Sequence, residues 1–139
     1  MRKGTLDANG RVVEEISYNA QGRVNGTDKS KFDSAGNLVE FVHLSPDGRQ
    51  AERKTHSFNA QGNATETRIY GPDDRLTSRT VYRYDGERLR EQLEYAADGT
   101  LSARYVNKRD AQGFVVEHIK YNAQGQIDSL DRSSYEFYP

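Results

Sequence analysis

The sequence contains no cysteine. This absence excludes a disulfide framework, a thiolate metal site and a cysteine nucleophile, although it is compatible with any redox compartment. No apolar run approaches the roughly 18 residues that a membrane-spanning helix needs. The first ten residues, MRKGTLDANG, also lack the apolar stretch of a signal peptide, so we expect a secreted form to be a piece of a longer chain.

Apolar residues are scarce: only 34% of the 139 residues are hydrophobic. Nine tyrosines and five phenylalanines nevertheless argue against a disordered chain. Together these features predict a fold that buries one thin apolar layer. The formal net charge of −1 indicates no particular class of partner.

Motifs of the common enzyme classes are absent as well. The chain has no G-x-S-x-G, no P-loop and no G-x-G-x-x-G. Its three histidines lack metal-ligand spacing, and we expect His43 and His118 to face outward and His56 to lie on the apolar side of a sheet. We therefore expect a protein that is not an enzyme and that uses no cofactor or metal.

What the sequence does contain is one short motif, repeated. The motif recurs ten times. It consists of an apolar residue, then usually Asp or Asn, two variable residues, Gly, one further residue and a second apolar residue. Self-similarity of this kind defines the architecture. The copies are LDANGRV (6–12), YNAQGRV (18–24), FDSAGNL (32–38), LSPDGRQ (44–50), FNAQGNA (58–64), YGPDDRL (70–76), YDGERL (84–89), YAADGTL (95–101), RDAQGFV (109–115) and YNAQGQI (121–127).

Each copy has the chemistry of a reverse turn. Asp, Asn or Ser can bond to the backbone two residues on, and Gly supplies the left-handed conformation of a three-residue hairpin loop. The shorter YDGERL predicts a two-residue type II′ turn at Gly86 and Glu87. The segments between turns alternate near 8 and 10 residues, and no helical periodicity runs through them.

The predicted fold is therefore all-β: an antiparallel meander of about eleven strands, in a single curled or spiralled layer. Its unit is a hairpin of about 26 residues, and residues 1–139 are expected to form one repeat domain. The predicted hairpin units are 11–36, 37–62, 63–86, 87–113 and 114–139.

The turn register predicts which residues share a face, because side chains alternate along a strand. A three-residue loop pairs Tyr95 with Leu101 and Tyr121 with Ile127. One face then carries apolar rows at both strand ends, with a glutamate in each short strand and small residues between. The glutamates are Glu14, Glu40, Glu66, Glu91 and Glu117, and the small residues are Gly26, Ser78, Ala103 and Ser129.

This glutamate ladder has two interpretations. It is either a structural row that pairs with neighbours such as Lys54 or faces water, or a set of carboxylates for cation binding or acid–base chemistry. Successive glutamates would lie about 10 Å apart, two strand spacings, which is too far for one metal ion. We favour the structural interpretation, and a glycosidase built from two ladder glutamates is the remaining enzymatic alternative.

By the same register the opposite face is predicted to be basic. It is either a solvated outer surface, whose long side chains discourage edge pairing, or a surface that binds anionic polymers. Its predicted cations are Arg11, Arg23, Lys29, Lys31, Arg49, Arg53, Arg75, Arg79, Arg83, Arg88, Arg90, Arg104, Lys108, Lys120 and Arg132. The candidate binding residues among them are Arg49, Arg53, Arg75, Arg79, Arg83, Arg88 and Arg104.

The motif resembles the YD repeat, Y-D-x-x-G-R-L, of RHS proteins, which include bacterial polymorphic toxins, toxin-complex subunits and the teneurin shell. The resemblance rests on YNAQGRV, FDSAGNL, YRYDGERL and YNAQGQI, and it extends over essentially the whole chain. It implies stacked hairpins that spiral into a secreted or surface-displayed shell around another domain. RHS repeats usually run near 20 residues, whereas this unit is longer, and the C-terminal RHS core signature is absent.

Two functions follow as expectations. The first is a structural or binding β-repeat module, a segment or small relative of a YD-repeat shell, with another protein domain as its partner. The alternative is a binder of anionic polymers, an acidic glycan rather than nucleic acid, because most aromatics lie away from the basic face. The apolar face or the edge strands could also pair two copies, with Tyr135, Phe137 and Tyr138 as a contact.

Overall fold

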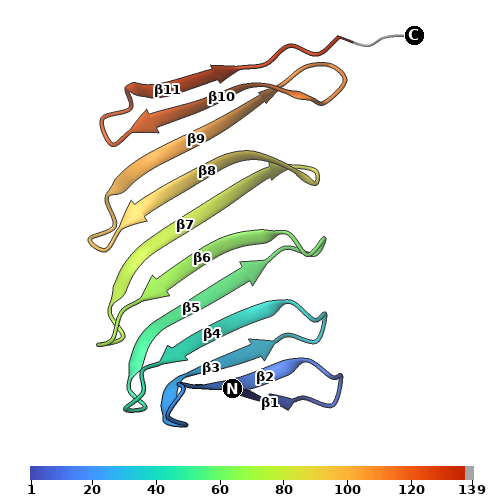
Figure 1. The fold of residues 1–139 in the computed structure, drawn as a ribbon. Helices are drawn as coiled ribbons and strands as arrows, with labels where there is room; N and C mark the ends of the chain where they lie inside the picture. Colours follow the sequence, from blue (N-terminus) through green and yellow to red (C-terminus); the bar gives the residue numbers. More distant parts are fainter. Residues whose placement is uncertain (137–139) are drawn as a thin grey trace. The chain divides into compact units, whose positions relative to one another are not determined.

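The computed structural model describes residues 1–136, which form eleven β-strands and no helix (Figure 1). No segment of these residues therefore qualifies as a membrane-spanning helix. Phe137 and Tyr138, proposed above as contact residues, lie outside the described residues. The strands are β1 (Arg2–Leu6), β2 (Val12–Tyr18), β3 (Val24–Phe32), β4 (Leu38–Leu44), β5 (Gln50–Phe58), β6 (Ala64–Tyr70), β7 (Leu76–Asp85), β8 (Arg88–Ala96), β9 (Leu101–Arg109), β10 (Val115–Asn122) and β11 (Ile127–Arg132).

The strands follow one another in sequence order in a single eleven-stranded sheet, and the strand order has two ends, β1 and β11. The predicted all-β antiparallel meander is confirmed. The chain divides into two compact units, Met1–Ser78 and Arg79–Pro139. The expectation of one domain over 1–139 stays a prediction.

The YNAQG turn has the predicted chemistry. The amide of Gly22 donates to the carbonyl of Asn19 at 3.0 Å, and the amide of Asn19 donates to the carbonyl of Arg23 at 2.9 Å. The side-chain oxygen of Asn19 accepts from the amides of Gln21 and Arg23, each at 3.0 Å. Gly22 has a φ of 73°, in the left-handed region that residues with a side chain rarely adopt.

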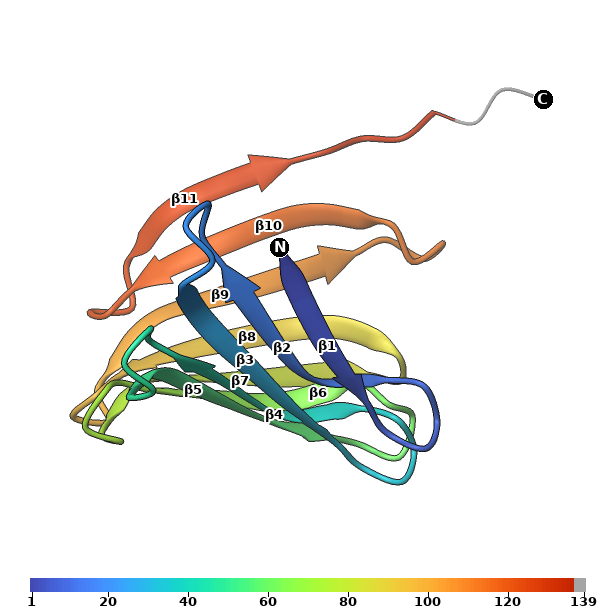
Figure 2. The ribbon, with the colours of Figure 1, turned by 60° about the horizontal axis from the view of Figure 1, so that its bottom comes forward.

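Two turns depart from this pattern in sequence, and both keep the chain reversal. In YGPDDRL the left-handed position is occupied by Asp74, whose φ is 58° and whose amide donates to the carbonyl of Gly71 at 3.1 Å. In YDGERL, β7 ends at Asp85 and β8 begins at Arg88, so Gly86 and Glu87 form a two-residue loop. Gly86 has a φ of 60°, as the predicted type II′ turn requires. Figure 2 shows the turns at both ends of the strands.

The predicted loop register is confirmed, because Tyr95 faces Leu101 and Tyr121 faces Ile127. A β-bulge then follows the turn. In the β2–β3 hairpin Tyr18 faces Val24 but Ser17 faces Gly26, so Asn25 is an extra residue in β3. The same shift occurs in the β4–β5, β8–β9 and β10–β11 hairpins. Such a bulge reverses which face the rest of the strand presents.

The bulge overturns the predicted separation into an apolar face with a row of glutamates and an opposite, basic face. Within each unit we call the face that carries Glu14, Glu40, Glu66, Glu91 and Glu117 the glutamate face, and the opposite one the histidine face. Predicted basic-face residues now lie directly opposite residues of the glutamate face, whereas three of the predicted small residues lie on the histidine face. The cations opposite residues of the glutamate face are Lys29, Lys31, Arg53, Arg104, Lys108 and Arg132. The small residues on the histidine face are Gly26, Ala103 and Ser129.

Burial is slight, as the scarcity of apolar residues predicts. Among residues 1–136 the buried hydrophobic side chains are Leu93, Ala103 and Ile119, and all three lie in the second unit. Glu91 is also buried, with 6% of its surface exposed. A carboxylate at such a position needs charged partners, since burial without them costs several kcal/mol.

Candidate functional site

Glu91 receives those partners from both neighbouring strands. The guanidinium of Arg83 on β7 donates to one carboxylate oxygen at 2.8 Å, and that of Arg104 on β9 donates to the other. Burial by itself would raise the pKa of Glu91, but the hydrogen bonds from Arg104 and Arg83 outweigh it and hold the pKa below its ordinary value. Glu91 is therefore a structural anion held by two cations.

Other ladder glutamates repeat this arrangement nearer the surface. Glu117 lies 2.9 Å from the ammonium of Lys108 and 3.1 Å from the guanidinium of Arg132, and hydrogen bonds from both lower its pKa. Glu40 lies 2.6 Å from the ammonium of Lys31. The bulge explains the pairing, because it brings the cations of the long strands onto the glutamate face. These pairs support the structural interpretation of the ladder, although Lys54 contacts Glu52 at 2.9 Å instead.

A second recurrent contact places an arginine of a long strand over a tyrosine at the end of the next short strand. The guanidinium carbon of Arg53 lies 4.0 Å from the ring centroid of Tyr70. The corresponding distances are 5.2 Å from Arg79 to Tyr95 and 5.2 Å from Arg104 to Tyr121. These are cation–π distances, so three of the candidate binding arginines already have an aromatic partner within the chain.

Two candidate arginines lie in turns. Arg49 pairs with Asp47 at 3.6 Å and Arg75 pairs with Asp73 at 3.1 Å. Their side chains are 87% and 86% exposed, so these are surface ion pairs that contribute little to folding. Both guanidinium groups remain accessible to a partner.

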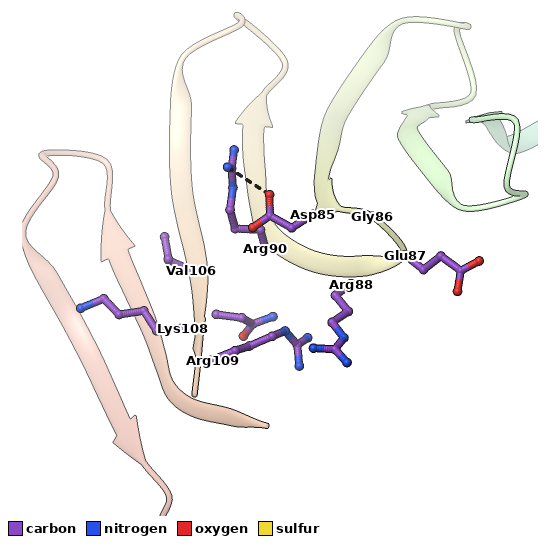
Figure 3. A pocket seen from close by; sticks show the side chains of 9 residues that line it. Asp85, Gly86, Glu87, Arg88, Arg90, Val106, Lys108 and Arg109 are labelled. Atoms are coloured by element: carbon purple, nitrogen blue, oxygen red, sulfur yellow. Dashed lines mark hydrogen bonds and ion pairs between the residues drawn. The ribbon is translucent and has the colours of Figure 1, made fainter. Parts of the chain in front are cut away.

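The last candidate, Arg88, belongs to a cavity of about 910 Å³ between the ends of β8 and β9. Figure 3 shows the guanidinium groups of Arg88 and Arg109 pointing toward one another, whereas Arg90 turns to Asp85, 3.3 Å away. Arg109 donates to the carbonyl oxygens of Gly113 at 3.0 Å and of Leu89 at 3.4 Å. The structure thus places Arg88 beside Arg109, a cation that was not among the candidate binding residues predicted from the sequence.

A signal for Arg109 was present in the sequence. In the copy RDAQGFV it occupies the position that is Leu, Tyr or Phe in every other copy. That departure from the repeat marks a place where a charge replaces an apolar contact.

The histidines lie apart from these arginines and act as hydrogen-bonding strand residues. A ring nitrogen of each is within hydrogen-bond distance of a neighbour: His43 of Asp28 at 2.6 Å, His56 of Thr67 at 2.9 Å and His118 of Asn107 at 2.7 Å. The placement of His56 on the opposite face from His43 is wrong, because Glu52 faces His43 and His56 follows Glu52 by four residues in the same strand. In residues 1–136 no three potential ligands gather into a metal site.

Comparison with known proteins gives likenesses of low similarity. No family model matches the chain, and no curated protein does. Among solved structures, TcdB2-TccC3-TEV aligns with 94% of this chain at 13% identity and a TM-score of 0.41, and TcdB2-TccC3-Cdc42 aligns with 91% at 14% identity and 0.36. This chain spans 8% and 9% of those two chains. A protein of unknown function from Bacteroides fragilis NCTC 9343 aligns over 96% of this chain and 91% of its own, at 14% identity and a TM-score of 0.36.

Proposed function

We propose that this chain is a non-catalytic structural and binding β-repeat module. In this role it is a segment or small relative of a YD-repeat shell and makes a surface or wall for another protein domain. The ten turn motifs, nine of which share one turn geometry, support the relationship to YD repeats.

The observation that carries the proposal is that the carboxylate of Glu91 is buried and paired with two arginines. A catalytic carboxylate in a glycosidase must reach substrate, either as a proton donor with a raised pKa or as a free nucleophile. Glu91 is 6% exposed, has a lowered pKa and has an arginine on each oxygen. The same side chain links β7, β8 and β9, which is what a structural role requires.

The experiment compares stability and catalysis in Glu91→Gln. The parent is incubated with a panel of neutral and acidic polysaccharides, and new reducing ends are measured. The proposal expects no release above buffer from either protein, together with a lower melting temperature for the variant. Release by the parent that disappears in Glu91→Gln at a temperature where both are folded would contradict it.

A second function, binding of an anionic polymer, is favoured by the exposure of Arg49 and Arg75. Each is held only by a surface pair with a nearby aspartate, so exchange to a carboxylate or sulfate of a glycan costs little. Binding of this kind is electrostatic and depends strongly on salt.

A further inference from the structure

The cavity between β8 and β9 holds two guanidinium groups that have no carboxylate partner among the described residues. Among residues 1–136, Arg88 has neither a hydrogen bond nor an ion pair, and Arg109 donates only to the two backbone carbonyls of Gly113 and Leu89. Every other candidate binding arginine contacts a carboxylate or an aromatic ring. This pair of like charges is therefore unusual within the chain.

The nearby acids are directed elsewhere. The side chain of Asp110 accepts hydrogen bonds from the backbone amides of Gln112 at 3.0 Å and Phe114 at 2.9 Å, and so caps its own turn. Asp85 pairs with Arg90, and Figure 3 shows Glu87 pointing away from Arg88 and Arg109. The positive charge of the two arginines is thus not compensated locally.

Gly113 lies directly against the guanidinium of Arg88. A Cβ atom at position 113 would lie 1.8 Å from Nη1 of Arg88 and 2.4 Å from its guanidinium carbon. The guanidinium therefore occupies the space that a side chain at this turn would fill. Because Gly113 also has a φ of 92°, the turn and the position of Arg88 depend on the same glycine.

We propose that Arg88 and Arg109 form a binding site for a tetrahedral dianion, the phosphate or sulfate group of a small ligand. Arg88 presents a free planar donor fork and Arg109 presents the N–H groups that Gly113 and Leu89 do not engage, and a tetrahedral oxyanion has enough oxygens to accept from both. Its double negative charge matches the two cations, which a single carboxylate does not. The cavity of about 910 Å³ leaves room for the remainder of a phosphate or sulfate ester. This site is distinct from the structural role proposed above and from the turn arginines Arg49 and Arg75.

The test is an NMR titration of the whole chain with inorganic sulfate and, separately, inorganic phosphate, followed at the Gly113 amide and the Nε–Hε groups of Arg88 and Arg109. Sodium chloride at equal ionic strength and sodium acetate are the comparison titrations. The proposal expects saturating shifts with sulfate and phosphate, and non-saturating shifts with chloride and acetate. Equal saturation by acetate would overturn the choice of a dianion, and linear shifts identical to those of chloride would overturn the site.

Variants localise the binding. Arg88→Gln, which removes no hydrogen bond or ion pair to another described residue, is expected to weaken sulfate binding about fivefold or more, and Arg109→Gln to do likewise. Arg90→Gln is the matched control. It removes a cation from the same cavity, but the guanidinium of Arg90 is already engaged by Asp85. The amide spectrum of each variant reports whether it is folded. An equal loss of binding in Arg90→Gln would show a general charge effect and overturn the assignment to Arg88 and Arg109.

Discussion

Arg53 and Tyr70 lie directly opposite one another on β5 and β6, and the guanidinium of Arg53 stacks 4.0 Å from the ring centroid of Tyr70. The same guanidinium donates to Asp74 at 2.9 Å and lies 3.6 Å from Glu40. One side chain thus joins β4, β5, β6 and the turn that follows β6. The bulge after each turn makes this possible, because it places Arg53 on the face of Tyr70.

A double-mutant cycle measures the stacking contribution. Arg53→Gln and Tyr70→Leu, singly and combined, are expected to show a coupling free energy of about 0.5–1 kcal/mol, the range of partly exposed cation–π pairs. The cycle removes the separate contributions of Asp74 and Glu40, which are lost equally in both backgrounds. Urea unfolding at pH 7 supplies the four free energies, and strictly additive values would show that the stacking contributes nothing.

Glu91→Gln is expected to destabilise the fold by about 2 kcal/mol at neutral pH, below the usual cost of breaking a fully buried pair because its arginines are partly exposed. The folded-state pKa of Glu91 is lowered. Its contribution is therefore complete above the unfolded pKa, near 4.5, and is lost as the pH falls through the folded value. The difference in unfolding free energy between parent and variant should shrink from pH 7 to pH 3. Glu117→Gln, at a more exposed site, is the control and should cost less at neutral pH. A pH-independent difference for Glu91 would contradict the ion pairing.

Gly22→Val tests the turn. Position 22 has a φ of 73° and no atom within 4 Å of a built Cβ, so the cost arises from backbone conformation alone. We expect a loss of about 1–2 kcal/mol, since a β-branched residue is forced into the left-handed region. Gly4→Val is the matched control, because a Cβ there makes ordinary contacts at 3.8 Å to Glu14 and 3.9 Å to Val12, at a position without positive φ. Thermal melts in which Gly22→Val and Gly4→Val behave alike would refute the assigned role of the glycine.

The polymer-binding function predicts retention on a heparin or polyuronate column at low salt. Arg49→Ser combined with Arg75→Ser should elute at lower salt than the parent with an unchanged melting temperature, since both side chains are almost fully exposed. The triple variant Arg53/Arg79/Arg104→Ser is the contrasting case. Its arginines stack on tyrosines, so we expect it to lose stability first. A parent that flows through at low salt would leave the structural role alone.

The repeated turns made the strand order predictable. Asn or Asp at the first turn position and Gly three residues later are local signals, because they act through backbone dihedrals and hydrogen bonds within five residues. The strand ends, the two-residue turn at Gly86 and the register of Tyr95 with Leu101 follow from them. These features depend on no distant part of the chain.

The faces of the sheet, by contrast, were decided by tertiary structure. One extra residue in β3, at Asn25, reverses the alternation of side chains that was predicted to continue past the turn. The extra residues, Asn25, Ala51, Ser102 and Asp128, share no residue type. The shift places cations opposite glutamates and arginines over tyrosines of neighbouring strands. The pairing of Arg104 with Glu91 and the convergence of Arg88 with Arg109 follow the same shift in the β8–β9 hairpin. The positions of the turns follow from the sequence alone, because turns form through local interactions. The partner of each charge, in contrast, depends on the cross-strand register of the folded sheet.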